Sequence, residues 1–115
     1  MSFTIRFSHS VTRDIDAALE YTLEQFGIDQ YEIYKGHIRR ALEEIGSDPR
    51  RPGSRWREEL HEDARVYHIS RIGKRARHYF VYRIVGDDII DLSRMLHDSM
   101  DLGQQLTEGF RAGDS

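Results

Sequence analysis

Two apolar runs joined by a short turn decide the fold of this chain. They are Tyr79-Phe80-Val81-Tyr82-Arg83-Ile84-Val85 and Ile89-Ile90-Asp91-Leu92-Ser93-Arg94-Met95-Leu96, with Gly86-Asp87-Asp88 between them. Both runs are rich in β-branched and aromatic residues, and a Gly-Asp link of this length is typical of a hairpin. A third run, Arg65 to Ile72, precedes them and ends at the turn Gly73-Lys74-Arg75. Three such runs with tight links predict an antiparallel meander that buries Tyr82 in its middle strand.

The N-terminal segment predicts one more strand and a helix. Residues 3–7 alternate apolar and polar side chains, and this pattern is typical of a strand. The apolar residues of that strand, which we expect to be buried, are Phe3, Ile5 and Phe7. Ser10 is placed to cap a helix that ends at Gly27, with Asp14 near the positive end of the helix dipole.

An apolar stripe from Tyr31 to Ile45 predicts a second helix. We expect it to start near Asp29 and to stop before Pro49, because proline and the glycine three residues earlier are typical of a helix end. The link between the two helices is so short that they must form an antiparallel hairpin. Residues 50–64 are polar and predict a long connection, which Trp56 and Leu60 would pin to the core.

The predicted order of elements is strand, helix, helix, strand, strand, strand. This order indicates an α+β fold of two layers, with an antiparallel helical hairpin packed on a mostly antiparallel four-stranded sheet. A chain of 115 residues has room for one domain. We expect that domain to span residues 1–106, with a short helix from Ser99 to Leu106, and residues 107–115 to form a flexible tail.

The composition excludes several classes of protein. With 38% hydrophobic and 32% charged residues, the chain has the composition of an ordinary globular domain. It contains no cysteine, which removes disulfides, thiolate metal sites and cysteine nucleophiles. No apolar run approaches the roughly 20 residues of a membrane helix, and the N-terminus lacks the order of a secretion signal. We therefore expect a cytoplasmic protein with no membrane contact.

The net charge of −3 conceals a basic segment in the middle of the chain. Residues 50–97 hold eleven Lys and Arg against seven Asp and Glu, which gives +4, whereas the segments on either side are acidic. Several arginines close together create a field that attracts an anionic partner, either nucleic acid or an acidic peptide. The alternative is a solvated arginine-rich face, and charge alone leaves the two open.

Several short motifs together resemble the ParE branch of the RelE/ParE toxins. In chain order they are Asp14-Ile15, Leu19-Glu20-Tyr21, Phe26-Gly27, Pro49, Arg65, Tyr82-Arg83-Ile84, Met95-Leu96-His97 and Met100-Asp101. The resemblance covers residues 3–106 and implies the toxin of a type II toxin–antitoxin system, held inactive by a cognate antitoxin. Toxins of the ParE branch poison DNA gyrase, whereas those of the RelE branch cut messenger RNA on the ribosome. Because both share one scaffold, the fold leaves the target open.

The residues at the end of the last strand bear on that choice. Cutting RNA requires groups that transfer protons and positive charge at the phosphate. His97 is the candidate acid or base and Arg83 a candidate phosphate ligand. A histidine at a strand end is, however, more often a structural hydrogen-bonder, and Arg83 is equally typical of an ion pair with Asp91. The aromatic residue that the nuclease branch often carries after this histidine is replaced by Asp98.

We therefore favour a non-enzymatic inhibitor of DNA gyrase that is neutralised by its antitoxin. The alternatives are a ribosome-dependent endoribonuclease that uses His97 with Arg65, Arg77 and Arg83, and a degenerate toxin that only binds its antitoxin. Contacts to a partner should come from basic residues of the middle segment and from aromatic residues of the helices. These candidates are Arg65, Arg71, Lys74, Arg77, Arg94, Tyr21 and Tyr31.

Three histidines, His68, His78 and His97, fall on neighbouring predicted strands. Metal sites in short chains usually show closely spaced ligand pairs, and this sequence has none. We therefore expect neither a metal ion nor a cofactor.

Overall fold

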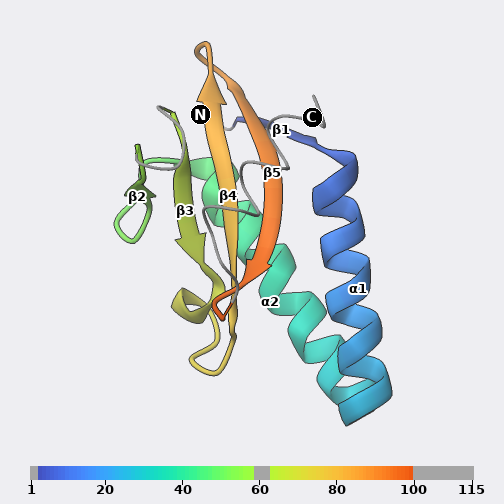
Figure 1. Ribbon diagram of the computed structural model, residues 1–115. Coiled ribbons are helices and arrows are strands. Elements are labelled where there is room, and N and C mark those ends of the chain that lie inside the picture. Colours follow the sequence, from blue (N-terminus) through green and yellow to red (C-terminus); the bar gives the residue numbers. More distant parts are fainter. Residues whose placement is uncertain (1–2, 59–62, 100–115) are drawn as a thin grey trace.

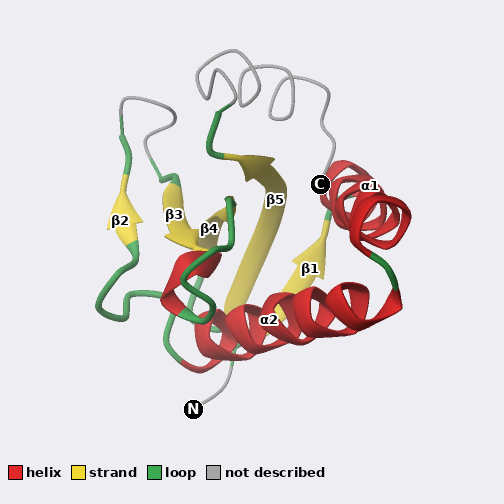
Figure 2. Ribbon diagram, turned by 90° about the horizontal axis from the view of Figure 1, so that it is seen from below, coloured by secondary structure: helices red, strands yellow, loops and turns green. Residues whose placement is uncertain are grey.

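The computed structural model describes residues 3–58 and 63–99 (Figure 1). The elements in chain order are β1 (Thr4–Phe7), α1 (His9–Phe26), α2 (Ile28–Ser47), β2 (Arg55–Trp56), β3 (Arg65–His68), the 3₁₀ turn η1 (Ile69–Arg71), β4 (His78–Val85) and β5 (Ile89–His97). Figure 2, which looks along the strands, shows both helices on one side of the sheet, with α2 across it and α1 beside β5. This arrangement confirms the predicted α+β fold of two layers.

Within residues 3–58 and 63–99 the sheet has five strands, in the order β1-β5-β4-β3-β2, so the predicted count of four was one too low. The additional strand is β2, in which Arg55 and Trp56 pair with Val66 and Arg65 of β3. The meander from β3 to β5 is antiparallel as predicted, and β1 joins its far edge in parallel to β5. Two residues are too short a pattern to predict a strand from alternation.

The first helix begins two residues earlier than predicted. Its N-cap is Ser8, whose hydroxyl accepts a hydrogen bond from the Val11 amide at 2.9 Å, whereas Ser10 lies inside the helix and is buried. Asp14 is consequently beyond the first turn, too far along the helix for the dipole interaction that we predicted. Gly27 ends α1 as predicted, and α2 follows directly from it and continues to Ser47.

Gly27 has a φ of +90°, which side chains other than glycine rarely adopt. We expect Gly27→Ala to lower the free energy of unfolding by about 1–3 kcal/mol, because the hairpin has to keep this strained backbone. Gly36→Ala is the control. Gly36 lies in the interior of α2 with open space around its Cα, so alanine there should stabilise the helix. Urea titrations that show the same change for both variants would contradict this assignment of strain.

The main core lies between the helices and the sheet. It contains Tyr67, Phe80 and Tyr82 from the meander and Ile38 and Ile45 from α2. Val81 and Leu96 are also fully buried, and they belong to a second cluster, with Val66 and Tyr79 packed against it.

Three predictions about buried or extended residues were wrong. Phe7 is 50% exposed because it lies at the end of the edge strand β1, and Trp56 is 60% exposed because the short β2 holds it at the other edge. The run from Arg65 leaves the sheet at His68, whose ring nitrogen accepts a hydrogen bond from the Ser70 amide and starts η1. Leu60, the predicted helix from Ser99 to Leu106 beyond its first residue, and the tail at 107–115 lie outside the described residues.

No helix in the described part of the chain is both long and apolar enough to cross a membrane.

Candidate interaction groove

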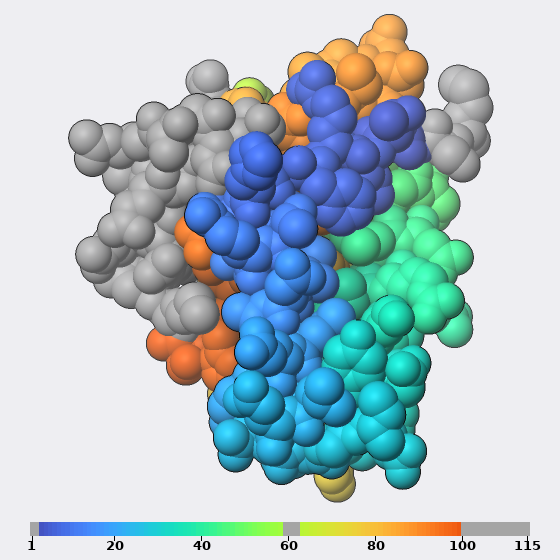
Figure 3. All heavy atoms as spheres, turned by 90° about the vertical axis from the view of Figure 1, so that its right-hand side faces the viewer, coloured from blue at the N-terminus to red at the C-terminus, as the bar shows by residue number. Residues whose placement is uncertain are grey.

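A groove of about 960 Å³ lies between the helical hairpin and the end of β5. Its walls come from α1, α2, the loop at residues 73–77 and the last residues of β5. Figure 3 shows the hairpin running through the middle and lower part of this face of the molecule, with the end of β5 emerging beside α1. The groove therefore lies on the face where the two layers of the fold meet.

The groove exists because β1 covers only half of β5. β1 pairs with Ile89–Leu92, and beyond that point α1 lies beside β5 in place of a strand. The first two turns of α1 form hydrogen bonds to the edge of β5 that β1 does not pair with. The Ser8 hydroxyl donates to the Ser93 carbonyl at 2.7 Å, and Asp14 accepts from the Met95 amide at 3.0 Å. Past Met95, α1 and β5 enclose the groove between them.

The groove wall on the helix side is apolar and open to solvent. Tyr21 and Phe26 of α1 are 59% and 64% exposed and contact each other edge to face, and Ile33 of α2 is 49% exposed. Large side chains exposed together in a groove are typical of a surface that binds a partner. Basic residues of the 73–77 loop, including Lys74 and Arg77, line the opposite side.

A polar cluster closes the inner end of the groove. The Tyr34 hydroxyl and the His78 Nδ1 atom are hydrogen-bonded at 2.5 Å, and the His97 ring lies edge-on to that of His78, with centroids 5.2 Å apart. Burial, assisted by the neighbouring His97, lowers the pKa of His78 to about 4, and burial raises the pKa of Tyr34 to about 12. Both groups are therefore neutral near pH 7.

Gly73 allows the loop at residues 73–77 to approach α2 closely at this end of the groove. A Cβ atom at this position would lie 2.4 Å from the His37 ring, so another residue here would force either the His37 side chain or the loop to move. Glycine therefore allows the basic loop to approach the helix closely.

The lowered pKa of His78 predicts an effect of pH on stability. A histidine whose pKa is lower in the folded than in the unfolded state favours folding above about pH 6.5, and this stability is lost as the pH falls towards 4. Because the ring is partly exposed, we expect a loss of about 1–2 kcal/mol from this residue. The difference in unfolding free energy between the wild type and His78→Asn should change by that amount between these pH values. A constant difference would contradict the prediction.

The structure brings some of the predicted site residues together. Tyr21, Lys74, Arg77 and His97 all line the groove. Arg94 is not among the residues that line it, but it forms an ion pair at 2.7 Å with Asp14, which is.

The other predicted binding residues lie elsewhere. Tyr31 is on α2 with the Lys35 ammonium 5.7 Å above its ring, outside the groove wall. Arg65 bonds to the Ser54 hydroxyl at 2.8 Å and supports the β2 hairpin. Arg71 lines a different cavity, near β2 and β3.

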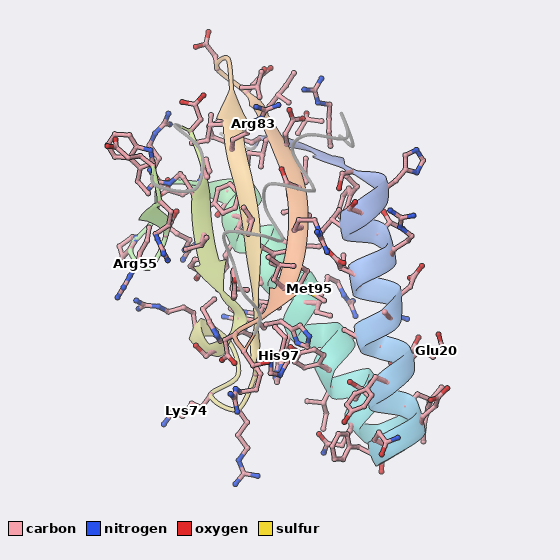
Figure 4. All side chains as sticks on the ribbon, viewed as in Figure 1. Glu20, Arg55, Lys74, Arg83, Met95 and His97 are labelled. Carbon is pink, nitrogen blue, oxygen red and sulfur yellow. The ribbon has the colours of Figure 1, made fainter. Side chains whose placement is uncertain are left out.

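His97 and Arg83, two of the four residues proposed for a nuclease, are not brought together, whereas Arg77 lines the groove with His97 and is paired with Asp98. His97 pairs with His78 at one end of β5, whereas Arg83 pairs with Asp91 towards the other end. Six residues along a strand span roughly 20 Å. Figure 4 shows the two side chains at opposite ends of the sheet. The Arg83 guanidinium lies 3.7 Å from the Asp91 carboxylate, so the predicted ion pair is present.

Sequence reasoning missed the roles of Asp14, Tyr34 and His78. Asp14 and Arg94, its partner on β5, are 80 positions apart in the sequence. Tyr34 of α2 and His78 of β4 are 44 positions apart. Such contacts depend on how the layers dock, which local periodicity does not report. Among the residues that the structure describes, no group of three His, Asp or Glu side chains is placed to hold a metal ion.

Comparison with known proteins shows the family. The model of the "ParE toxin of type II toxin-antitoxin system, parDE" matches residues 5–102. The curated proteins named Toxin ParE1 from two Mycobacterium tuberculosis strains are 26% identical over 106 residues, which is 92% of this chain and all of theirs. A solved structure described as "Chromosomal ParDE TA system from P. aeruginosa" has the same fold, with a TM-score of 0.67 and 14% identity over 84% of this chain and 96% of that one. The chain therefore belongs to the ParE family of toxins of type II toxin–antitoxin systems.

Proposed function

We propose that the groove between the helical hairpin and β5 binds the cognate antitoxin. The observation that carries this proposal is the pairing of an exposed apolar wall, formed by Tyr21, Phe26 and Ile33, with the basic 73–77 loop on the opposite side. An amphipathic segment can place its apolar side chains on the first wall and its acidic ones near the second. A volume of about 960 Å³ accommodates several large side chains of such a segment.

We propose further that the free toxin inhibits DNA gyrase by binding rather than by catalysis. The chain belongs to the ParE family, and the resemblance to the ParE branch implies DNA gyrase as the target. Membership of the family therefore supports gyrase. The separation of His97 from Arg83 favours binding over catalysis, because proton transfer and phosphate stabilisation have to act on the same atoms. Arg77 does lie near His97, but its guanidinium is already paired with the Asp98 carboxylate at 2.9 Å. The His97 Nδ1 atom is in addition hydrogen-bonded to Ser99, at 2.7 Å from its hydroxyl.

The groove predicts which residues the antitoxin needs. We expect Phe26→Ala combined with Ile33→Ala to weaken antitoxin binding about 100-fold, since two large side chains at the centre of an interface carry much of its energy. The control is Leu23→Ala combined with Ile28→Ala. These residues are also exposed on the hairpin, at 42% and 59%, but they are not among the groove residues. Titration calorimetry with the antitoxin, the product of the adjoining reading frame, measures the affinity of both double variants. Equal losses in the two double variants would contradict the groove.

The target can be tested in cells. After induction of the toxin without its antitoxin, we expect DNA synthesis to stop before protein synthesis, and purified gyrase to lose supercoiling activity in its presence. Mapping messenger RNA ends in the same cells tests the alternative, which is a nuclease. If ribosome-bound messages are cut within codons, and His97→Ala lowers this cutting by about 10²–10⁴, the chain is a nuclease.

A further inference from the structure

A second cavity, of about 470 Å³, lies at the β2 and β3 end of the sheet. Three arginines line it: Arg55 in β2, Arg57 directly after it, and Arg71 at the end of η1. Figure 4 shows Arg55 at the edge of the sheet opposite to α1, so this cavity lies far from the wall of the antitoxin groove on that helix. No function proposed above uses these residues together.

The Arg71 side chain packs against the turn before β2. Gly53, in the turn before β2, has a φ of +98°, and a Cβ atom there would lie 2.8 Å from Nε of Arg71 and 3.2 Å from the Tyr67 ring. Glycine therefore leaves room for the guanidinium of the exposed Arg71 side chain to pack against the turn. This contact places the guanidinium in the wall of the cavity.

An aromatic pair lies beside the arginines. His68 of β3 and Tyr79 of β4 are directly opposite each other in the sheet, and their rings are stacked with centroids 6.1 Å apart and an interplanar angle of 29°. Both line the cavity and both are partly exposed. Stacked rings next to cationic side chains are typical of surfaces that bind single-stranded nucleic acid, because bases stack on the rings while phosphates meet the cations.

The acidic residue at this site does not cancel its positive charge. Asp98 is the only carboxylate among the described residues of the cavity wall. Arg77 donates from Nε to both of its oxygens at 3.0 Å, and this bond is the main cause of the lowered pKa of Asp98. Because Arg77 offsets that negative charge, Arg55 and Arg71 leave the cavity positively charged.

We propose that this cavity binds a short single-stranded segment of nucleic acid. Arg55 and Arg71 contact consecutive phosphates, and Tyr79 with His68 provides the surface on which a base stacks. An acidic peptide would use the arginines but would gain nothing specific from the aromatic pair, so the combination favours a nucleotide. The inference is independent of the antitoxin groove and of gyrase as the target.

Fluorescence anisotropy with short labelled oligonucleotides of DNA and of RNA tests the proposal on the full chain. We expect Arg55→Gln combined with Arg71→Gln to weaken binding tenfold or more, because two charge-assisted contacts are lost. The salt dependence should fall as well, by about 0.7 in the slope of log K against log salt for each lost phosphate contact. Arg39→Gln combined with Arg40→Gln removes the same charge from the exposed side of α2 and should leave both quantities unchanged.

Tyr79 tests the stacking surface separately. Tyr79→Leu should weaken binding about tenfold, whereas Tyr79→Phe keeps a ring and should bind like the wild type. A thermal melt of every variant shows that the fold is intact.

Binding of either DNA or RNA with this pattern supports the site. The oligonucleotide that binds more tightly shows whether the site prefers deoxyribose or ribose. Three results would overturn the proposal: equal losses in both arginine pairs, tighter binding of polyglutamate than of either oligonucleotide, or no binding by the wild type. Calorimetry of the arginine variants with the antitoxin is a separate measurement, so a failure here is distinguishable from a failure of the groove.

Discussion

Tyr82→Ala is expected to lower the free energy of unfolding by about 3–5 kcal/mol, as the truncation of a large buried aromatic residue does. Tyr82 is fully buried in β4 and belongs to the core that joins the sheet to α2. Its backbone pairs with Arg65 of β3 and Leu92 of β5, so it lies on a central strand of the sheet. Alanine would leave a cavity in the core between the sheet and α2.

The hydroxyl of Tyr82 adds a separate contribution. It donates to the Pro49 carbonyl at 2.6 Å and contacts the Ser54 hydroxyl at 2.6 Å, and Arg65 bonds to the same serine. Tyr82→Phe keeps the ring and should therefore cost only about 1–3 kcal/mol. Urea denaturation of the two variants measures both effects. If Tyr82→Phe is as damaging as Tyr82→Ala, the stability comes from the hydrogen bonds that hold the loop after α2, and not from packing of the ring.

Local patterns in the sequence were enough to predict the layers of the fold. Hydrophobic periodicity located both helices, and the glycine turns located the meander, because each depends on residues close together in the chain. The ends of elements were less predictable. Ser10 was chosen as the cap of α1 in place of Ser8, because both are typical caps and only the docking of Ser8 on Ser93 selects between them. β2 escaped detection because two residues show no period.

The groove was predicted only in part, for a related reason. Tyr21 and the basic loop residues could be named as candidates from their type and spacing. That they face each other follows from where β1 ends on β5, which is a property of the whole sheet. From the sequence alone, Arg65, Arg77 and Arg83 were equally good candidates. All three form internal hydrogen bonds or ion pairs, but of the three Arg77 lines the groove. Residue type identifies possible contacts, and strand register decides which of them meet.

Asp14→Ala is expected to destabilise the protein by about 2–4 kcal/mol, because this side chain closes the part of β5 that β1 leaves uncovered. Its carboxylate accepts two hydrogen bonds from Arg94, at 2.7 and 3.1 Å, and one from the Met95 amide at 3.0 Å. The side chains of Asp14 and Arg94 are only 17% and 14% exposed, so water replaces the lost partner poorly. Removing one member of a buried ion pair commonly costs about 3–5 kcal/mol, and partial exposure reduces that figure here.

Two further variants distinguish the contribution of the Asp14–Arg94 ion pair from that of the hydrogen bond to the edge of β5. Asp14→Asn retains an oxygen that can accept from the Met95 amide and should cost less than Asp14→Ala. Asp14→Ala combined with Arg94→Met removes both charges, and it should recover part of the stability that Asp14→Ala loses, since no charge is then left without its partner. The remaining loss in the double variant measures the bond to the Met95 amide. If the double variant is no more stable than Asp14→Ala, the ion pair contributes nothing, and Asp14 acts only as the substitute for a neighbouring strand along the edge of β5.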